Sequence, residues 1–127
     1  MTPFKRGSVV LALFPNSDLR TAKRRPVLIV QADGLGTGIS QSVVAMISSK
    51  TQRAGHPSRI FVTAGSDVGR KSGVPHDSVI LTDNLATIHH REFDKVLGVF
   101  PEMEAIDAAL VHTLGISSSP FSQSDSN

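Results

Sequence analysis

The stretch KRRPVLIV, residues 23–30, places three cationic side chains directly before a proline and an apolar run that favours a β-strand. A guanidinium can bind a phosphate through two parallel hydrogen bonds, so an arginine held rigidly at this point is suited to phosphate binding. Two interpretations of Lys23, Arg24 and Arg25 are open. Either the three cations are a solvated loop end, or one of them is fixed where a phosphate will bind.

The formal net charge of the 127-residue chain is only +2, but its cations are unevenly distributed. Between Arg20 and Lys71 the only acids are Asp33 and Asp67, and most of the other carboxylates follow from Asp77 onward. The cations of that stretch are Arg20, Lys23, Arg24, Arg25, Lys50, Arg53, Arg59, Arg70 and Lys71. This asymmetry favours a polyanionic partner for one face, although an ordinary soluble surface is also compatible with it. The absence of Tyr and Trp argues against a base-stacking platform.

Polar residues follow two of the expected strands. Ser48 ends the run SVVAMIS, with Lys50 two residues further on, and a hydroxyl there can hydrogen-bond a phosphate oxygen. Asp83 follows the run SVILT, where a strand end would present a loop residue. The alternative explanation is an ordinary strand end for Ser48 and a turn-forming Asp-Asn pair for Asp83. The five histidines lack metal-ligand spacing and the chain has no cysteine, so the sequence favours neither a metal site nor a disulfide framework.

Apolar, β-branched runs separated by glycine, proline and charged residues predict a mainly β domain. We expect strands over residues 8–14, 26–31, 42–48, 58–64 and 78–82, with shorter pieces near 87–90 and 95–100. Residues 15–24 and the glycine-rich segment ADGLGTGIS are expected to be loops. Short strands at this spacing are typical of a small barrel or sandwich.

The chain then changes character and predicts a C-terminal helix over residues 101–115. The segment PEMEAIDAALVHTLG has proline at the first helical position, acids in the first turn and glycine at its end. Met103, Ile106, Leu110 and Leu114 lie on one helical face, so we expect them to pack on the sheet or on a partner.

The domain organisation expected from the sequence is one domain over residues 1–116 and a disordered serine-rich tail over 117–127. The N-terminal apolar run of seven residues is too short for a secretory signal or a membrane span. We therefore expect a cytoplasmic protein without membrane contact.

The order of these segments resembles the MazF/PemK family of toxin endoribonucleases from about Lys5 to Gly115. KRRPVLIV and SVILTDNLATI carry the resemblance most specifically. It implies an SH3-like β-barrel of the MazF/PemK/CcdB toxin type with a C-terminal helix, acting as a homodimer. It also implies cofactor-free and metal-independent cleavage of single-stranded RNA at short sequences. The further partner implied is a cognate antitoxin, with DNA contacted only indirectly through that antitoxin.

The resemblance also implies roles for individual residues. Arg25 stands where the family has the arginine that acts on the scissile phosphate, and Ser48 where it usually has a threonine contacting that phosphate. The implied reaction is attack by the RNA 2′-hydroxyl, leaving a 2′,3′-cyclic phosphate and a 5′-hydroxyl. The expected substrate-binding residues are Lys23, Arg24, Arg20, Ser49, Lys50, Arg53 and Asp83.

The chain departs from the family pattern in its first loop. Many members have a glutamate there as the candidate base, whereas this loop, PNSDLRTAKRR, has Arg20 near that place and Asp18 as its only carboxylate. Ser8 replaces the usual acid after the first glycine. Three readings follow: Asp18 is the base, the base matters less than Arg25, or the activity is weakened.

Two other functions remain open. A CcdB-like toxin that binds gyrase would share the fold, but the absence of tryptophan and the polar C-terminus count against it. A non-catalytic nucleic-acid-binding barrel would need the cations without a fixed pair of Arg25 and Ser48.

Overall fold

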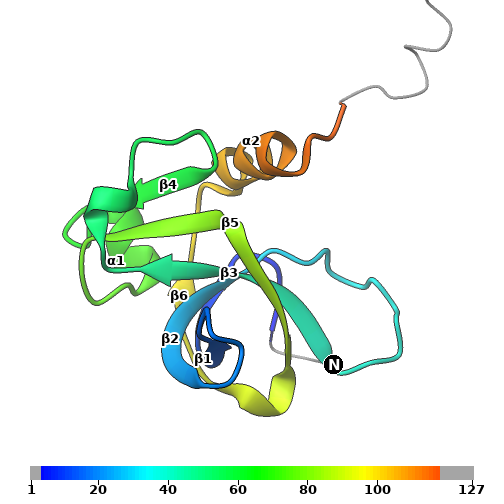
Figure 1. Cartoon of the computed structure of the whole chain (residues 1–127). Helices are drawn as coiled ribbons and strands as arrows, with labels where there is room; N and C mark the ends of the chain where they lie inside the picture. The colour runs from blue at the N-terminus through cyan, green and yellow to red at the C-terminus, as the bar shows by residue number, and fades with distance from the viewer. Residues whose placement is uncertain (1–3, 118–127) are drawn as a thin grey trace, which may run out of the picture.

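The computed structural model describes residues 4–117, which form one six-stranded antiparallel sheet and two α-helices (Figure 1). The strands lie in the order β4-β5-β3-β2-β1-β6. Their bounds are β1 Ser8–Pro15, β2 Ala22–Ile29, β3 Gln41–Ser48, β4 Arg59–Val62, β5 Ser78–His89 and β6 Phe93–Val99. The helices are α1 Asp67–Ser72 and α2 Met103–Leu114, and single 3₁₀ turns span Thr51–Arg53 and His90–Glu92. The predicted mainly β fold with a C-terminal helix is confirmed.

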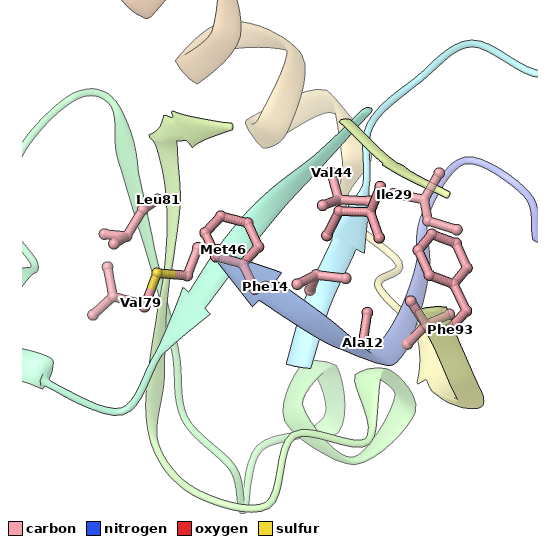
Figure 2. Packing of buried hydrophobic residues seen from close by; sticks show 11 residues of the cluster. Ala12, Phe14, Ile29, Val44, Met46, Val79, Leu81 and Phe93 are labelled. Atoms are coloured by element: carbon pink, nitrogen blue, oxygen red, sulfur yellow. The ribbon is translucent and has the colours of Figure 1, made fainter. Parts of the chain in front are cut away.

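Both faces of the sheet are covered, and each has its own apolar cluster. The inner face, around which the sheet curls, carries a cluster that includes Phe14, Val44, Met46 and Phe93 (Figure 2). The outer face carries a second cluster that includes Leu28, Ile80 and Phe100, together with Ile106 of α2. Successive side chains of a strand point to opposite faces, so β2 supplies Val27 and Ile29 to the inner cluster and Leu28 to the outer one.

Helix α2 packs against β4 and β5. Ile106 is fully buried, and Met103 and Leu110 pack on the outer cluster as expected. Leu114, which the same stripe predicted to be packed, is 55% exposed. Gly115 ends the helix in the left-handed conformation that glycine favours.

No helix within residues 4–117 is long and apolar enough to cross a membrane. The predicted disordered tail falls almost entirely on residues 118–127, which lie outside the described part of the chain.

Several predicted boundaries are wrong, and two of them bear on the site. Strand β2 begins at Ala22, so Lys23 and Arg24 belong to the strand and not to the preceding loop. Residues 22–24 pair with β1, as in Lys23 with Phe14, and this pairing leaves no apolar pattern in the sequence. Strand β5 runs unbroken from Ser78 to His89, so Asp83 lies within a strand rather than in a loop after one. A register shift between Ala45 and Met46 of β3 accommodates the polar residues there.

Helix α1 was not predicted, because its six residues, DVGRKS, are polar and contain a glycine. The packing of α1 explains why a glycine occupies position 69. A Cβ atom at Gly69 would collide with the carbonyl oxygen of Thr63, so only glycine permits this close approach. The Ser66 hydroxyl caps the helix by accepting a hydrogen bond from the Gly69 N–H.

Candidate active site around Arg25

The site begins where β2 and β3 stop pairing. Their ladder consists of Val27 with Met46, Leu28 with Ala45 and Ile29 with Val44, and Pro26 has no N–H with which to extend it. The same register continued by two residues would set Arg25 opposite Ser48. We call the point where β2 and β3 stop pairing the split. Arg25 lies two residues from Val27 and Ser48 two residues from Met46, both of which point to the inner face, so Arg25 and Ser48 flank the split on the inner face.

In the described part of the chain, the Arg25 guanidinium has no carboxylate partner. Its Nη2 donates a hydrogen bond of 3.1 Å to the amide oxygen of Asn16. Its Nε is buried and has no hydrogen-bond partner among residues 4–117. No carboxylate in that part of the chain lies within ion-pair distance of Arg25, whereas Arg6, Arg24, Arg59 and Arg91 each pair with one.

A pocket of about 400 Å³ opens beside Arg25 on the inner face. Lys50 and Arg53 line it as well, so three of the predicted site cations meet there. Its other lining residues are Phe14, Pro15, Asn16, Ser17, Met46, Asn84 and Leu85, none of them acidic. An apolar floor with a cationic, acid-free rim suits a phosphodiester that carries a base or sugar against its apolar part. We call this hollow the basic pocket.

A second pocket, of about 330 Å³, lies on the outer face and shares Arg25 with the first. Lys23, Arg24 and Ser49, all predicted to bind substrate, line it together with His76, which sequence reasoning did not assign. Arg24 is already engaged there, because its Nη1 lies 2.5 Å from an Asp94 carboxylate oxygen of β6. The side chain of Arg25 therefore borders both hollows, and Arg24 faces only the outer one.

Ser48 lies at the split but lines neither pocket. Its side chain is 3% exposed, and its hydroxyl oxygen accepts a hydrogen bond of 3.1 Å from the Lys50 N–H. The hydroxyl proton is left to donate to another acceptor. Ser48 thus lies at the split, with its hydroxyl proton left as a donor.

Asp18 and Arg20 line neither pocket. The Asp18 carboxylate accepts hydrogen bonds from the N–H groups of Arg20 and Thr21, at 2.8 and 3.0 Å, and from the Thr21 hydroxyl. These bonds, led by the Thr21 N–H, lower the pKa of Asp18. A carboxylate stabilised in this way is a weaker proton acceptor. The described geometry shows Asp18 closing its own turn.

Asp83 also lines neither pocket. Its carboxylate forms a two-pronged ion pair with Arg59 of β4, with contacts of 2.8 and 3.3 Å. The hydrogen bond from Arg59 lowers the pKa of Asp83. The neighbouring Asn84 lines the basic pocket instead, and its side-chain nitrogen donates to the Met46 sulfur. In the motif LTDNLATI, sequence reasoning singled out the carboxylate and missed the amide beside it.

Residues 4–117 contain no group of three histidine, aspartate or glutamate side chains placed to hold a metal ion. The histidines serve other contacts. The rings of His56 and His112 lie 5.9 Å apart, and Nε2 of His90 lies 2.8 Å from the Ser42 hydroxyl. His90 borders a larger pocket of about 610 Å³ beside the glycine-rich loop, which contains none of the predicted site residues.

Known proteins resemble this chain in sequence. Residues 5–114 match the family described as PemK-like, MazF-like toxin of type II toxin-antitoxin system. The chain is 33% identical to Endoribonuclease EndoA of Bacillus subtilis over 116 residues, covering 88% of this chain and 95% of EndoA. It is 29% identical to Endoribonuclease MazF6 of Mycobacterium tuberculosis over 107 residues, covering 82% and 90% of the two chains.

Solved structures agree on the fold. An endoribonuclease from a mycobacterial species superposes with a TM-score of 0.66 at 25% identity, covering 91% of this chain and 95% of the other. A second, an endoribonuclease in complex with its cognate antitoxin, gives a TM-score of 0.67 at 23% identity, with 89% and 96% covered. The family match spans all six strands and both α-helices. The chain therefore belongs to the PemK-like, MazF-like family of toxins of type II toxin–antitoxin systems.

Proposed function

We propose that this toxin is a sequence-specific, metal-independent endoribonuclease that cleaves single-stranded RNA. Family membership and the relatives named endoribonucleases support the reaction class. The observation that carries the proposal is that Arg25 has no carboxylate partner among residues 4–117. It stands at the split between β2 and β3 and borders a pocket whose lining residues include no acid.

In the proposed reaction the scissile phosphate binds to the terminal N–H groups of Arg25. The RNA 2′-oxygen attacks the adjacent phosphorus while the bond from phosphorus to the 5′-oxygen breaks, the 2′-hydroxyl releases its proton, and the leaving 5′-oxygen takes up a proton from water. The products are a 2′,3′-cyclic phosphate and a 5′-hydroxyl. Negative charge develops on the phosphoryl oxygens in the transition state, and a preorganised guanidinium stabilises that charge more than the charge of the ground state.

The remaining cations hold the strand on either side of that phosphate. Lys50 and Arg53 bind the RNA strand in the basic pocket, and the Ser48 hydroxyl donates to a phosphoryl oxygen. Lys23 and Ser49 extend the path onto the outer face, where Arg24 contributes less because Asp94 neutralises it. Phosphate contacts fix the strand without reading its sequence, so specificity rests on how bases fit the pockets.

The 2′-hydroxyl proton needs an acceptor, and the loop offers only Asp18 as a carboxylate. The hydrogen bonds to Asp18 lower its pKa and make it a weak base. The missing loop glutamate left three interpretations open. We favour the one in which Arg25 lowers the barrier by stabilising the developing charge and the general base contributes little to the rate.

We further infer that the protein acts in the cytoplasm as a homodimer held inactive by a cognate antitoxin. The family description supports the antitoxin. An antitoxin segment with acidic or apolar side chains would complement the same cationic, apolar-floored surface that RNA uses. DNA would be contacted only through the antitoxin.

Incubation of the purified protein with a long unstructured RNA, in chelator and without added metal, tests the reaction. We expect cleavage at a short recurring sequence, with cyclic-phosphate and 5′-hydroxyl ends, and cleavage slower by about 10²–10³-fold with Arg25→Ala. Tight RNA binding without cleavage would instead support the non-catalytic barrel. A requirement for a divalent metal would overturn the mechanism.

A further inference from the structure

Asn16 is the one side chain among residues 4–117 to which Arg25 donates a hydrogen bond. The sequence predicted only that Asn16 lies in the loop of residues 15–24, yet its amide links Arg25 to a turn that has hydrogen bonds of its own. The Asn16 N–H donates to the Thr21 carbonyl oxygen, and the Leu19 N–H donates to the Asn16 carbonyl oxygen, both at 2.9 Å. The turn of residues 16–21 is therefore closed around the residue that contacts Arg25.

A chain of polar groups fixes which end of the Asn16 amide faces Arg25. The Asp18 carboxylate can only accept, so the Thr21 hydroxyl donates its proton to it. The Thr21 oxygen then accepts from the Asn16 side-chain nitrogen, at 2.9 Å. The amide oxygen is thereby left to accept from Nη2 of Arg25. Each member of the chain sets the direction of the next, beginning with the charge of Asp18.

We propose that Asn16 is a positioning residue that orients the Arg25 guanidinium toward the scissile phosphate without neutralising its charge. The proposal rests on the proposed function. A guanidinium has five N–H donors. Asn16 takes one and Nε is enclosed, so the three remaining protons, all on the terminal nitrogens, are left for the phosphate. Rotation about the end of the side chain would otherwise spread these protons over many orientations.

The neutral amide is the informative part of this arrangement. Four other arginines within residues 4–117 are held by carboxylates, as Arg59 is by Asp83 and Arg24 by Asp94. A carboxylate would orient Arg25 equally well, but it would compete with the phosphate for the same positive charge. An amide oxygen supplies the acceptor geometry and leaves the full charge for the substrate.

Two substitutions separate orientation from charge. Asn16→Asp keeps an acceptor of the same shape and adds a negative charge, so single-turnover cleavage should fall by about 10²-fold, like the loss of a preorganised donor. Asn16→Ala removes the acceptor alone, and we expect a fall of about tenfold, the equivalent of one hydrogen bond. Affinity for an RNA with 2′-deoxyribose at the scissile position should change little in Asn16→Ala and clearly weaken in Asn16→Asp.

The anchor of the amide provides a rescue test. Thr21→Val should reproduce the rate loss of Asn16→Ala in weaker form, because the amide can then rotate. Thr21→Ser keeps the hydroxyl and should restore the parental rate. Gln41→Glu is the matched control: it makes the same amide-to-carboxylate change at the start of β3, outside both Arg25 pockets, and should leave cleavage unchanged.

A spectroscopic readout keeps the proposal testable apart from activity. In NMR spectra of ¹⁵N-labelled parent protein, slow rotation of the Arg25 guanidinium should give separate signals for its two Nη atoms. In Asn16→Ala and Thr21→Val the guanidinium should rotate faster, so the two signals should merge. Melting temperatures identify any variant that has lost its fold. If Asn16→Ala does not fold, Thr21→Val takes its place in the comparison. Parental cleavage by Asn16→Asp, or unchanged Nη signals in Asn16→Ala, would overturn the proposal. A parent protein that cleaves no RNA would overturn the proposed function, while the Nη signals would still decide the role of Asn16.

Discussion

Arg24 and Arg25 are consecutive residues of β2, yet their surroundings differ in kind. The side chain of Arg24 lies half exposed on the outer face, with its charge matched by Asp94 at 2.5 Å. The side chain of Arg25 lies partly buried at the split on the inner face, with a neutral amide as its partner. Because successive side chains of a strand point to opposite faces, the two arginines differ in their partners. Arg24 is paired with a carboxylate, and Arg25 has no carboxylate partner among residues 4–117.

The number of cations in a segment therefore does not show where the site lies. Of the nine cations between Arg20 and Lys71, Arg24, Arg59 and Lys71 are paired with carboxylates. Exposed pairs of this kind contribute little to stability and take charge away from any polyanion. The basic pocket gathers the cations Arg25, Lys50 and Arg53, none of which has a carboxylate partner in the described chain.

Among the substitutions that leave the charge of Arg25 in place, the largest effect is expected from replacing its guanidinium with an ammonium group. Arg25→Lys should lower single-turnover cleavage by about 10- to 100-fold, because an ammonium cannot bond Asn16 and present parallel donors to a phosphate. Arg24→Lys should cleave at close to the parental rate, since its ion pair needs only a positive charge. Equal losses in the two variants would contradict the distinction between the faces.

Ser48→Ala should have the next largest effect. The variant loses the donor proposed to contact the phosphoryl oxygen, and one hydrogen bond corresponds to about a tenfold slower cleavage. Ser72→Ala is a suitable control, because Ser72 is equally buried but donates only to the Gly69 carbonyl oxygen within α1. It should lower the melting temperature and leave the rate unchanged. A parental rate in Ser48→Ala would remove Ser48 from the site.

A smaller effect should come from making Arg24 resemble Arg25. Asp94→Asn frees the guanidinium of Arg24, so RNA affinity should rise a few-fold, and the slope of log K against log salt should steepen by about one. Adding Arg24→Ala should cancel the gain. Unchanged affinity would mean that the RNA does not pass over the outer face at this point.

The smallest effect concerns a paired arginine that supports the fold. Asp83 has a lowered pKa in the folded protein, so its pair with Arg59 stabilises the fold above the ordinary carboxyl pKa of about 3.9. That contribution is lost as the pH falls through the lower folded pKa. Asp83→Asn should therefore melt slightly below the parent at pH 7 and converge with it in acid. Weaker RNA binding by this variant would instead support the predicted substrate-binding role of Asp83.

The sequence predicted what apolar patterns encode. Strands β1 and β3, the start of β5 and the core of α2 were expected from β-branched runs and helical spacing, and they were found there. The start of β2 was missed because its cations join the sheet through backbone pairing, which leaves no periodic pattern. The length of β5 was missed because the register shift lets Asp83 and Asn84 sit inside a strand.

The site was predicted less completely, for a physical reason. Arg25 and Ser48 were identified through the family resemblance, and both lie two residues beyond the last pair of the β2–β3 ladder, Val27 with Met46. The pairing of Arg24 with Asp94 joins residues 70 positions apart, so no local pattern reveals it. Asparagine is common in turns, so the residue type of Asn16 indicates no special role. Its contact with Arg25 depends on the conformation of the turn of residues 16–21. Whether a charge is free or paired is decided by the tertiary fold.

The most direct test of the account compares chemistry with binding in Arg25→Ala. Single-turnover cleavage at saturating protein, in chelator, should fall by about 10²–10³-fold, as for the loss of a preorganised donor to a developing charge. Affinity for the uncleavable 2′-deoxy RNA should fall far less, because Lys50 and Arg53 still hold the strand in the basic pocket. Cleavage at the parental rate, or losses of rate and affinity of the same size, would contradict the assignment of Arg25 to the transition state.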